Sequence, residues 1–320
     1  MFSSVARRRP LNLSPRQIPL TTTRCFNTSP YFTMADQVKR NPHPDFKGVE
    51  ASRPDWNIES KFRYTKTVNP DWKFGDGANK LHEGDAGKKH VAIDPHEEGR
   101  NPGFNYKFLI SAITPRPIAF VSTRSADGSS TNLAPFSYFN MVNHDPPLFV
   151  VGIASGLGNA KDTLRNVSES GECVINIISE PFVEAANSAS ANAPYGVSEW
   201  DISGLTPVYD CETVKCARVG EAVVSIEAKL DTLKEYDSRA RPGNKSGTIA
   251  IFEGTRFWVR EDAINEERNL VDPQVLRPIS RLGGITYGRT TEVMEIPRVD
   301  FEKDVGGLEG AEKLKKQNSQ

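Results

Sequence analysis

Short apolar runs separated by turn residues fill the middle of the chain. Residues 116–123, 148–154, 173–178 and 248–252 are β-branched or aromatic runs of strand length. Residues 222–233 alternate instead, with Val224 and Ile226 on one face and Glu227 and Lys229 on the other. Such alternation indicates an antiparallel sheet with one solvated face. Because alternating strand–helix units are absent, the pattern predicts a mainly β protein with a few short helices and not a Rossmann fold.

A hairpin is predicted around Asp127-Gly128, which separates the run 116–123 from the run 131–136. An Asp-Gly pair favours a tight turn because glycine tolerates a positive φ. The return strand contains Pro135, which has no N–H for a ladder hydrogen bond. We therefore expect this strand to leave its sheet near Ala134 and to expose free backbone groups there. Pro146-Pro147 then starts the next strand.

A helix is predicted to begin near Asn159 and to end at Gly171. Asn159 is a suitable capping residue, and Asp162 stands three positions later and orders the turn. Lys161 and the Thr163 hydroxyl lie beside the unpaired N–H groups of this helix start, an arrangement that suits a phosphate. An ordinary capped surface helix is the alternative. A second helix is predicted over residues 181–191 and a last sheet segment over 279–288.

Four motifs occur in a fixed order: TPRPIAFVST (114–123), NLAPFSYF (132–139), the strand after Pro146-Pro147, and KDT (161–163). Together they resemble the flavin reductase-like family, the FMN-binding split β-barrels that include flavoredoxins, over roughly residues 104–297. The resemblance implies a split barrel that binds FMN, takes hydride from NAD(P)H and passes electrons to a flavin or a partner protein. It also implies a homodimer with FMN near the subunit boundary. Because the flavin carries the chemistry, no catalytic side chain is required.

The resemblance also implies which residues contact the flavin. The TPRP segment makes Arg116 a phosphate or ribityl partner, with a surface strand arginine as the alternative. The backbone of Asn132, Leu133, Ala134 and Pro135 is expected to face the flavin edge, with amides bonding the ring. Ser137 and Tyr138 follow as candidate contacts for ribityl or phosphate oxygens, although Tyr138 also suits the core. Arg281 and Tyr287 are implied to lie near the flavin or the dimer interface, with packing around Gly283-Gly284 as the alternative.

The first 35 residues contain no Asp or Glu but five arginines, which is the composition of a mitochondrial transit peptide. A cleavage site is predicted after Phe26, and Met34 is a candidate second start for a cytosolic form. An arbitrary basic tail is the alternative. Residues 36–103 are polar yet carry aromatics such as Trp56 and Trp72, which predicts an extended arm that docks on the barrel or on a partner subunit. Residues 104–300 form the predicted barrel, and 301–320 a solvated charged tail.

Composition and the absence of certain motifs exclude several classes of function. A net charge of −1 gives no field for nucleic acid or an anionic membrane surface, and no apolar run is long enough to span a bilayer. The sequence contains neither HExxH nor GxSxG, and Cys211 and Cys216 do not have the spacing of a zinc half-site. Three functions stay open: an FMN-dependent NAD(P)H oxidoreductase, a flavoredoxin-like electron carrier, and a flavin-free barrel that acts as an interaction module.

Overall fold

The computed structural model describes residues 45–60, 62–79, 81–85 and 87–317. The predicted leader, its cleavage site and Met34 lie outside the described residues. The chain divides into two compact units, residues 1–54 and 55–320. In the first unit, helix α2 (Phe46–Ala51) is capped by Asp45, whose side chain accepts a hydrogen bond from the Gly48 amide.

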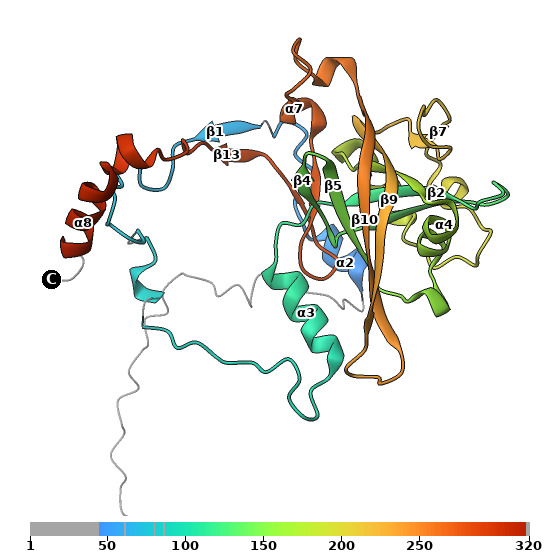
Figure 1. The fold of residues 1–320 in the computed structure, drawn as a ribbon, viewed down its shortest axis with the longest axis horizontal. Helices are drawn as coiled ribbons and strands as arrows, with labels where there is room; N and C mark the ends of the chain where they lie inside the picture. The colour runs from blue at the N-terminus through green and yellow to red at the C-terminus, as the bar shows by residue number, and fades with distance from the viewer. Residues whose placement is uncertain (1–44, 61, 80, 86, 318–320) are drawn as a thin grey trace, which may run out of the picture. The chain divides into compact units, whose positions relative to one another are not determined.

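A seven-stranded antiparallel sheet forms the centre of the second unit, with the strand order β3-β2-β6-β9-β10-β5-β4. Figure 1 shows β9 and β10 as two long neighbouring ribbons, with β4 and β5 on one side and β2 and α4 on the other. Its strands are β2 (Ala119–Arg124), β3 (Thr131–Phe136), β4 (Phe139–His144), β5 (Pro147–Ile153), β6 (Glu172–Ile177), β9 (Val224–Asp237) and β10 (Lys245–Val259). The mainly β prediction is confirmed.

Both faces of this sheet are buried near β2. Phe120 belongs to a cluster with Leu133 and Trp200, whereas Ala119 and Val121 belong to a second cluster with Leu164 of α4. Side chains of successive residues point to opposite faces of a strand, so β2 contributes to two cores at once. This explains why residues 116–123 form a continuous apolar run and do not alternate.

Strand β3 corrects the expectation that the chain leaves the sheet near Ala134. The strand continues through Pro135, which pairs with Phe120, to Phe136. Proline is accepted here because β3 is an edge strand, where an outward-facing nitrogen needs no partner strand. Strand β4 at the other edge was not predicted, because its sequence FNMVNH has only a weak apolar pattern.

Strand β9 has the predicted solvated face at Lys229 and Asp231, which are exposed, but not at Glu227. Glu227 was expected to face water, but it is fully buried. Its carboxylate accepts hydrogen bonds from the Glu212 and Thr213 amides and from Trp258 Nε1, the last at 2.7 Å. A buried carboxylate is tolerated when its oxygens are satisfied in this way.

The helices begin and end partly as predicted. Helix α4 (Asp162–Ser170) ends at Gly171, which has the left-handed φ of 71° typical of a helix stop. Its N-cap, however, is Lys161 and not Asn159, because the Asn159 side chain instead accepts from the Gly156 amide. The predicted helix 181–191 is shorter and consists of η3 (Glu180–Phe182) and α5 (Val183–Ser188). Helix α3 (Pro102–Ala112), capped by Asn101, was missed.

The predicted arm and tail carry regular structure. Strand β1 (Arg63–Thr65) pairs in parallel with β13 (Glu292–Met294), and the Arg289 guanidinium lies 4.0 Å from the centre of the Trp56 ring. The C-terminal segment, expected to fray, forms η5 (Phe301–Val305) and α8 (Gly307–Gln317). The remaining elements are η1 (Glu83–Asp85), η2 (Leu157–Asn159), α6 (Glu199–Ser203), β7 (Pro207–Val208), β8 (Arg218–Val219), η4 (Glu261–Ala263), α7 (Pro273–Leu276), β11 (Ile279–Arg281) and β12 (Tyr287–Arg289).

Candidate functional site

A cavity of about 360 Å³ lies between edge strand β3 and the first turn of α4. Residues 189–193, which follow α5, and Glu199 of α6 complete its wall. It brings together six of the residues that the sequence singled out. These six are Asn132, Ala134, Pro135, Lys161, Asp162 and Thr163. The edge of β3 and the start of α4 therefore meet in one cavity.

The N-terminus of α4 is open toward this cavity. Its N-cap residue, Lys161, has an extended backbone and makes no side-chain capping hydrogen bond. The first intrahelical bond runs from the Arg165 amide to the Lys161 carbonyl at 2.9 Å, so the preceding amides have no helical partner. The exposed Lys161 side chain adds a full positive charge to the partial charge of the helix terminus. Such a terminus is a good anion site.

A buried polar network ties the two sides of the cavity together. Asn132 and Thr163 lie 2.8 Å apart, between Nδ2 and Oγ1. In the amide orientation that satisfies every neighbour, Asn132 accepts from Thr163 and donates to Glu199 Oε2 at 3.2 Å. Burial raises the pKa of Glu199, and the hydrogen bond from the Leu133 amide partly offsets this. In this arrangement the Thr163 hydroxyl is engaged within the protein, and the network fixes β3 against α4.

The backbone of β3 offers the cavity fewer amides than expected. The Leu133 amide donates to Glu199 Oε2 at 3.2 Å, so it faces away from β2. Alternation along an antiparallel strand then turns the amides of Asn132 and Ala134 toward β2, and Pro135 has none. Residues 132–135 therefore present carbonyl groups and side chains, not a row of free amides.

Arg116 lies outside the lining of this cavity and is buried. Its Nη1 donates to the carbonyls of Ile110 and Ile113 at 2.6 and 2.7 Å, and its Nη2 to the Leu282 carbonyl at 3.0 Å. Burial lowers the pKa of this guanidinium. The residue therefore joins the end of α3 to the segment after β11, and a direct contact with flavin stays a prediction.

Ser137, Tyr138, Arg281 and Tyr287 also lie outside the lining of the cavity. Ser137 Oγ accepts from Arg116 Nε at 3.4 Å. The Arg281 guanidinium stacks 4.4 Å from the centre of the Tyr287 ring, and the Tyr287 hydroxyl donates to Asn187 Oδ1 at 2.8 Å. Asn187 belongs to α5, directly before the cavity wall 189–193. Tyr287 thus supports the wall indirectly.

Glu199 is the main site residue that the sequence did not identify. It is the first residue of α6, and its neighbour Trp200 packs in the core cluster that contains Phe120 and Leu133. A lone Glu before Trp gives no sequence signal for burial. No group of three or more His, Cys, Asp or Glu side chains that would hold a metal occurs within the described ranges. None of the helices described there is long and apolar enough to cross a membrane.

Comparison with known proteins places these features in a family. The family model for the flavin reductase like domain matches residues 111–276, more than half of the chain. An uncharacterised protein of Halalkalibacterium halodurans is 36% identical over 197 residues, which cover 61% of this chain and 90% of that protein.

Two solved structures are also similar to this chain. Component B of nitrilotriacetate monooxygenase from Bacillus cereus has a TM-score of 0.60 and 34% identity, covering 65% of this chain and 100% of that chain. A Shewanella frigidimarina flavin reductase with a split barrel domain has a TM-score of 0.55 at 20% identity, covering 66% of this chain and 100% of that chain. The chain therefore belongs to the flavin reductase-like family of flavoproteins and has its split-barrel fold.

Proposed function

We propose that this protein is an FMN-dependent oxidoreductase that takes hydride from NADH or NADPH and passes the electrons to a second flavin or to a partner protein. The observation that carries the proposal is the uncapped N-terminus of α4, which opens into the same cavity as the edge of β3. The phosphate of FMN needs an anion site, which the helix N-terminus offers, and its flat ring needs a rigid wall, which the strand edge offers.

The residues present suit FMN. Lys161 and the unpaired amides at the start of α4 would hold the phosphate, because both are donors with positive character. The Ala134 and Pro135 segment of β3 would form the wall beside the ring. Bound FMN would supply the hydride and electron transfer, so the protein's task is to bind and orient it.

Glu199 and Asn132 act on this site by keeping it rigid. Glu199 holds the Leu133 amide and the Asn132 side chain, and Asn132 holds Thr163 at the beginning of α4. Each bond joins a part of the wall to a part of the phosphate site. A network of this kind fixes the distance between them, which lowers the entropy cost of binding.

We infer that the protein acts as a homodimer. Helix α3 exposes Phe104, Phe108 and Leu109, and β4 exposes Met141 and Val142, each at 48–59%. Apolar side chains gathered on one helix and one edge strand are typical of a surface that a second copy covers. Trp200 is buried within one chain and does not belong to this exposed surface. The electron acceptor is a small flavin or a protein, and the monooxygenase component named above supports a protein acceptor.

We further propose that residues 1–35 direct the protein to the mitochondrial matrix and that initiation at Met34 gives a cytosolic form. The absence of acidic residues from this segment supports the proposal.

The proposed activity is tested on the purified full-length chain. Its absorption spectrum is recorded first, and anaerobic oxidation of NADH and NADPH is then followed with and without added FMN. Flavin absorption bands together with nucleotide oxidation support the oxidoreductase. Tightly held FMN without nucleotide oxidation would identify an electron carrier. A colourless protein that does not take up added FMN would refute both and leave an interaction module.

A further inference from the structure

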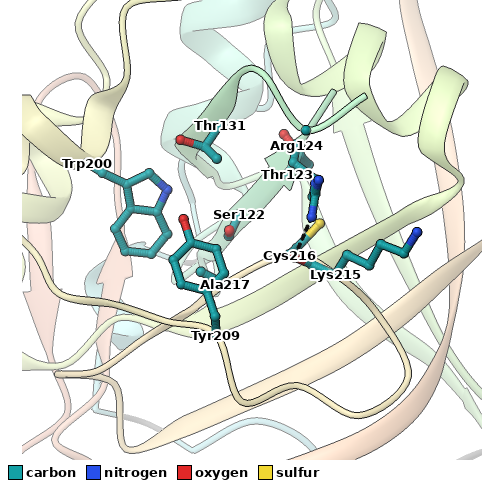
Figure 2. Close-up of a pocket in the computed structure, with 10 residues that line it drawn as sticks. Ser122, Thr123, Arg124, Thr131, Trp200, Tyr209, Lys215, Cys216 and Ala217 are labelled. Carbon is teal, nitrogen blue, oxygen red and sulfur yellow. Dashed lines mark hydrogen bonds between the residues drawn. The ribbon is translucent and has the colours of Figure 1, made fainter. Parts of the chain in front are cut away.

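A second cavity of about 260 Å³ lies at the end of β2 and shares no lining residue with the proposed flavin cavity. Figure 2 shows it between the β2–β3 hairpin, Trp200 and the loop that follows β7. The side chains that decide its chemistry are Ser122, Arg124, Trp200, Tyr209 and Cys216.

Trp200 brings an unsatisfied donor to this cavity. The residue is only 5% exposed, and its Nε1 is buried without a hydrogen-bond partner among the described residues. Figure 2 shows the indole nitrogen on the edge that faces Thr131 and the Tyr209 hydroxyl. A buried N–H without an acceptor costs free energy, so native structures seldom leave one unexplained. A bound acceptor oxygen would satisfy it.

Arg124 supplies a positive charge that is not neutralised. The only hydrogen bond of its side chain to a described residue runs from Nη1 to the Lys215 carbonyl at 3.5 Å, the outer limit for such a bond. The side chain forms no ion pair with any residue in the described part of the chain. The guanidinium packs so closely over Gly128 that a β-carbon there would overlap it. The Lys215 ammonium extends away from Trp200 in Figure 2. Arg124 is therefore the cation of this cavity.

The other groups of the cavity add donors and apolar surface but no negative charge. The Ser122 hydroxyl makes no hydrogen bond with any described residue. Burial raises the pKa of Cys216 to about 12, so its thiol stays protonated at neutral pH. The Glu172 carboxylate accepts a hydrogen bond from the Lys215 amide at 2.9 Å and does not line the cavity. The rings of Trp200 and Tyr209 form flat apolar walls.

We propose that this cavity is a binding site for a small aromatic carboxylate. The fork of N–H groups on Arg124 matches the two oxygens of a carboxylate, and Trp200 Nε1 or the Ser122 hydroxyl donates to the same group. One aromatic ring fits the volume and the flat walls, whereas a nucleotide is too large. Thr131 and Trp200 of this cavity are the chain neighbours of Asn132 and Glu199 in the flavin cavity, so the two sites share a wall.

Calorimetric titration of the full-length protein with benzoate, in saturating FMN, tests this proposal. Benzamide serves as the neutral probe of the same shape. The variants are Arg124→Gln, Trp200→Phe, which keeps a ring but removes the N–H, and Arg239→Gln, an exposed arginine at the tip of the β9–β10 hairpin. Circular dichroism of each variant shows whether it is folded.

We expect one benzoate per chain and at least tenfold weaker binding of benzamide. Arg124→Gln should weaken the binding of benzoate by at least about 10-fold and Trp200→Phe by at least about 5-fold, because each substitution removes a hydrogen bond to the charged carboxylate. Arg239→Gln should change nothing. Absence of saturable binding would overturn the proposal, and so would equal binding by folded Arg124→Gln. Competition between benzoate and FMN would assign the ligand to the flavin cavity and would also overturn it.

Discussion

Replacement of Lys161 by alanine tests the proposed phosphate site, because it removes a single ammonium group from that site. Lys161 stands at the open start of α4, and its side chain is exposed. Two unit charges 4 Å apart interact by about 1 kcal/mol in water and by about 4 kcal/mol near a protein surface. Because the ammonium is exposed, we take the lower half of this range, about 1–2 kcal/mol. FMN should then bind about 5- to 30-fold more weakly to Lys161→Ala.

Riboflavin lacks the phosphate, so its affinity should change less than about twofold in the same variant. Fluorescence titration measures both dissociation constants. Arg165→Ala is the matched control, because Arg165 is the next exposed cation on α4 and stacks 4.3 Å from the centre of the Tyr195 ring. Equal losses for FMN and riboflavin, or equal effects of the two variants, would refute the assignment of the phosphate to this helix.

Three further predictions concern stability, assembly and location. The hydrogen bonds of Glu227 outweigh the effect of burial and lower its pKa from 4.5 to about 2. Ionisation of this carboxylate therefore contributes about 3 kcal/mol to the free energy of unfolding above pH 4.5. This contribution is lost progressively as the pH falls from 4.5 to about 2. Urea unfolding should show that Glu227→Gln is destabilised at pH 7 and has a flatter pH dependence in that window. Light scattering should find a dimer, and Phe108→Asp on α3 should give monomers; a wild-type monomer that binds FMN equally well would contradict the shared site. A fluorescent fusion to residues 1–33 should enter mitochondria and Arg24→Asp should impair its cleavage, whereas diffuse signal would count against targeting.

Local pattern was sufficient for most of the sheet. The Asp127-Gly128 turn and the runs on either side predicted the β2–β3 hairpin, and Gly128 has the positive φ of 75° that this turn requires. Pro135 misled the prediction because the effect of a proline depends on whether its strand is at an edge. That property belongs to the whole sheet and cannot be read from six residues. The prediction that Glu227 faces water failed for a similar reason, because its hydrogen-bond donors come from a loop and from β10.

The site was predictable to the extent that it is local in sequence. Lys161, Asp162 and Thr163 form the start of one helix, and that helix start does face the edge of β3. The Glu199 carboxylate accepts a hydrogen bond from the Leu133 amide, although the two residues are 66 positions apart. Only the tertiary structure reveals this contact. Arg116 shows the reverse case. Its sequence motif indicated a contact with flavin, but its guanidinium donates hydrogen bonds to three backbone carbonyls.

The central claim is that FMN occupies the cavity between β3 and α4, and a crystal structure of the full-length protein with FMN measures this directly. The account predicts the phosphate at the first turn of α4, within hydrogen-bond distance of Lys161 and the neighbouring amides, and the ring beside Ala134 and Pro135. Flavin bound elsewhere on the chain, or a phosphate that does not contact α4, would contradict it.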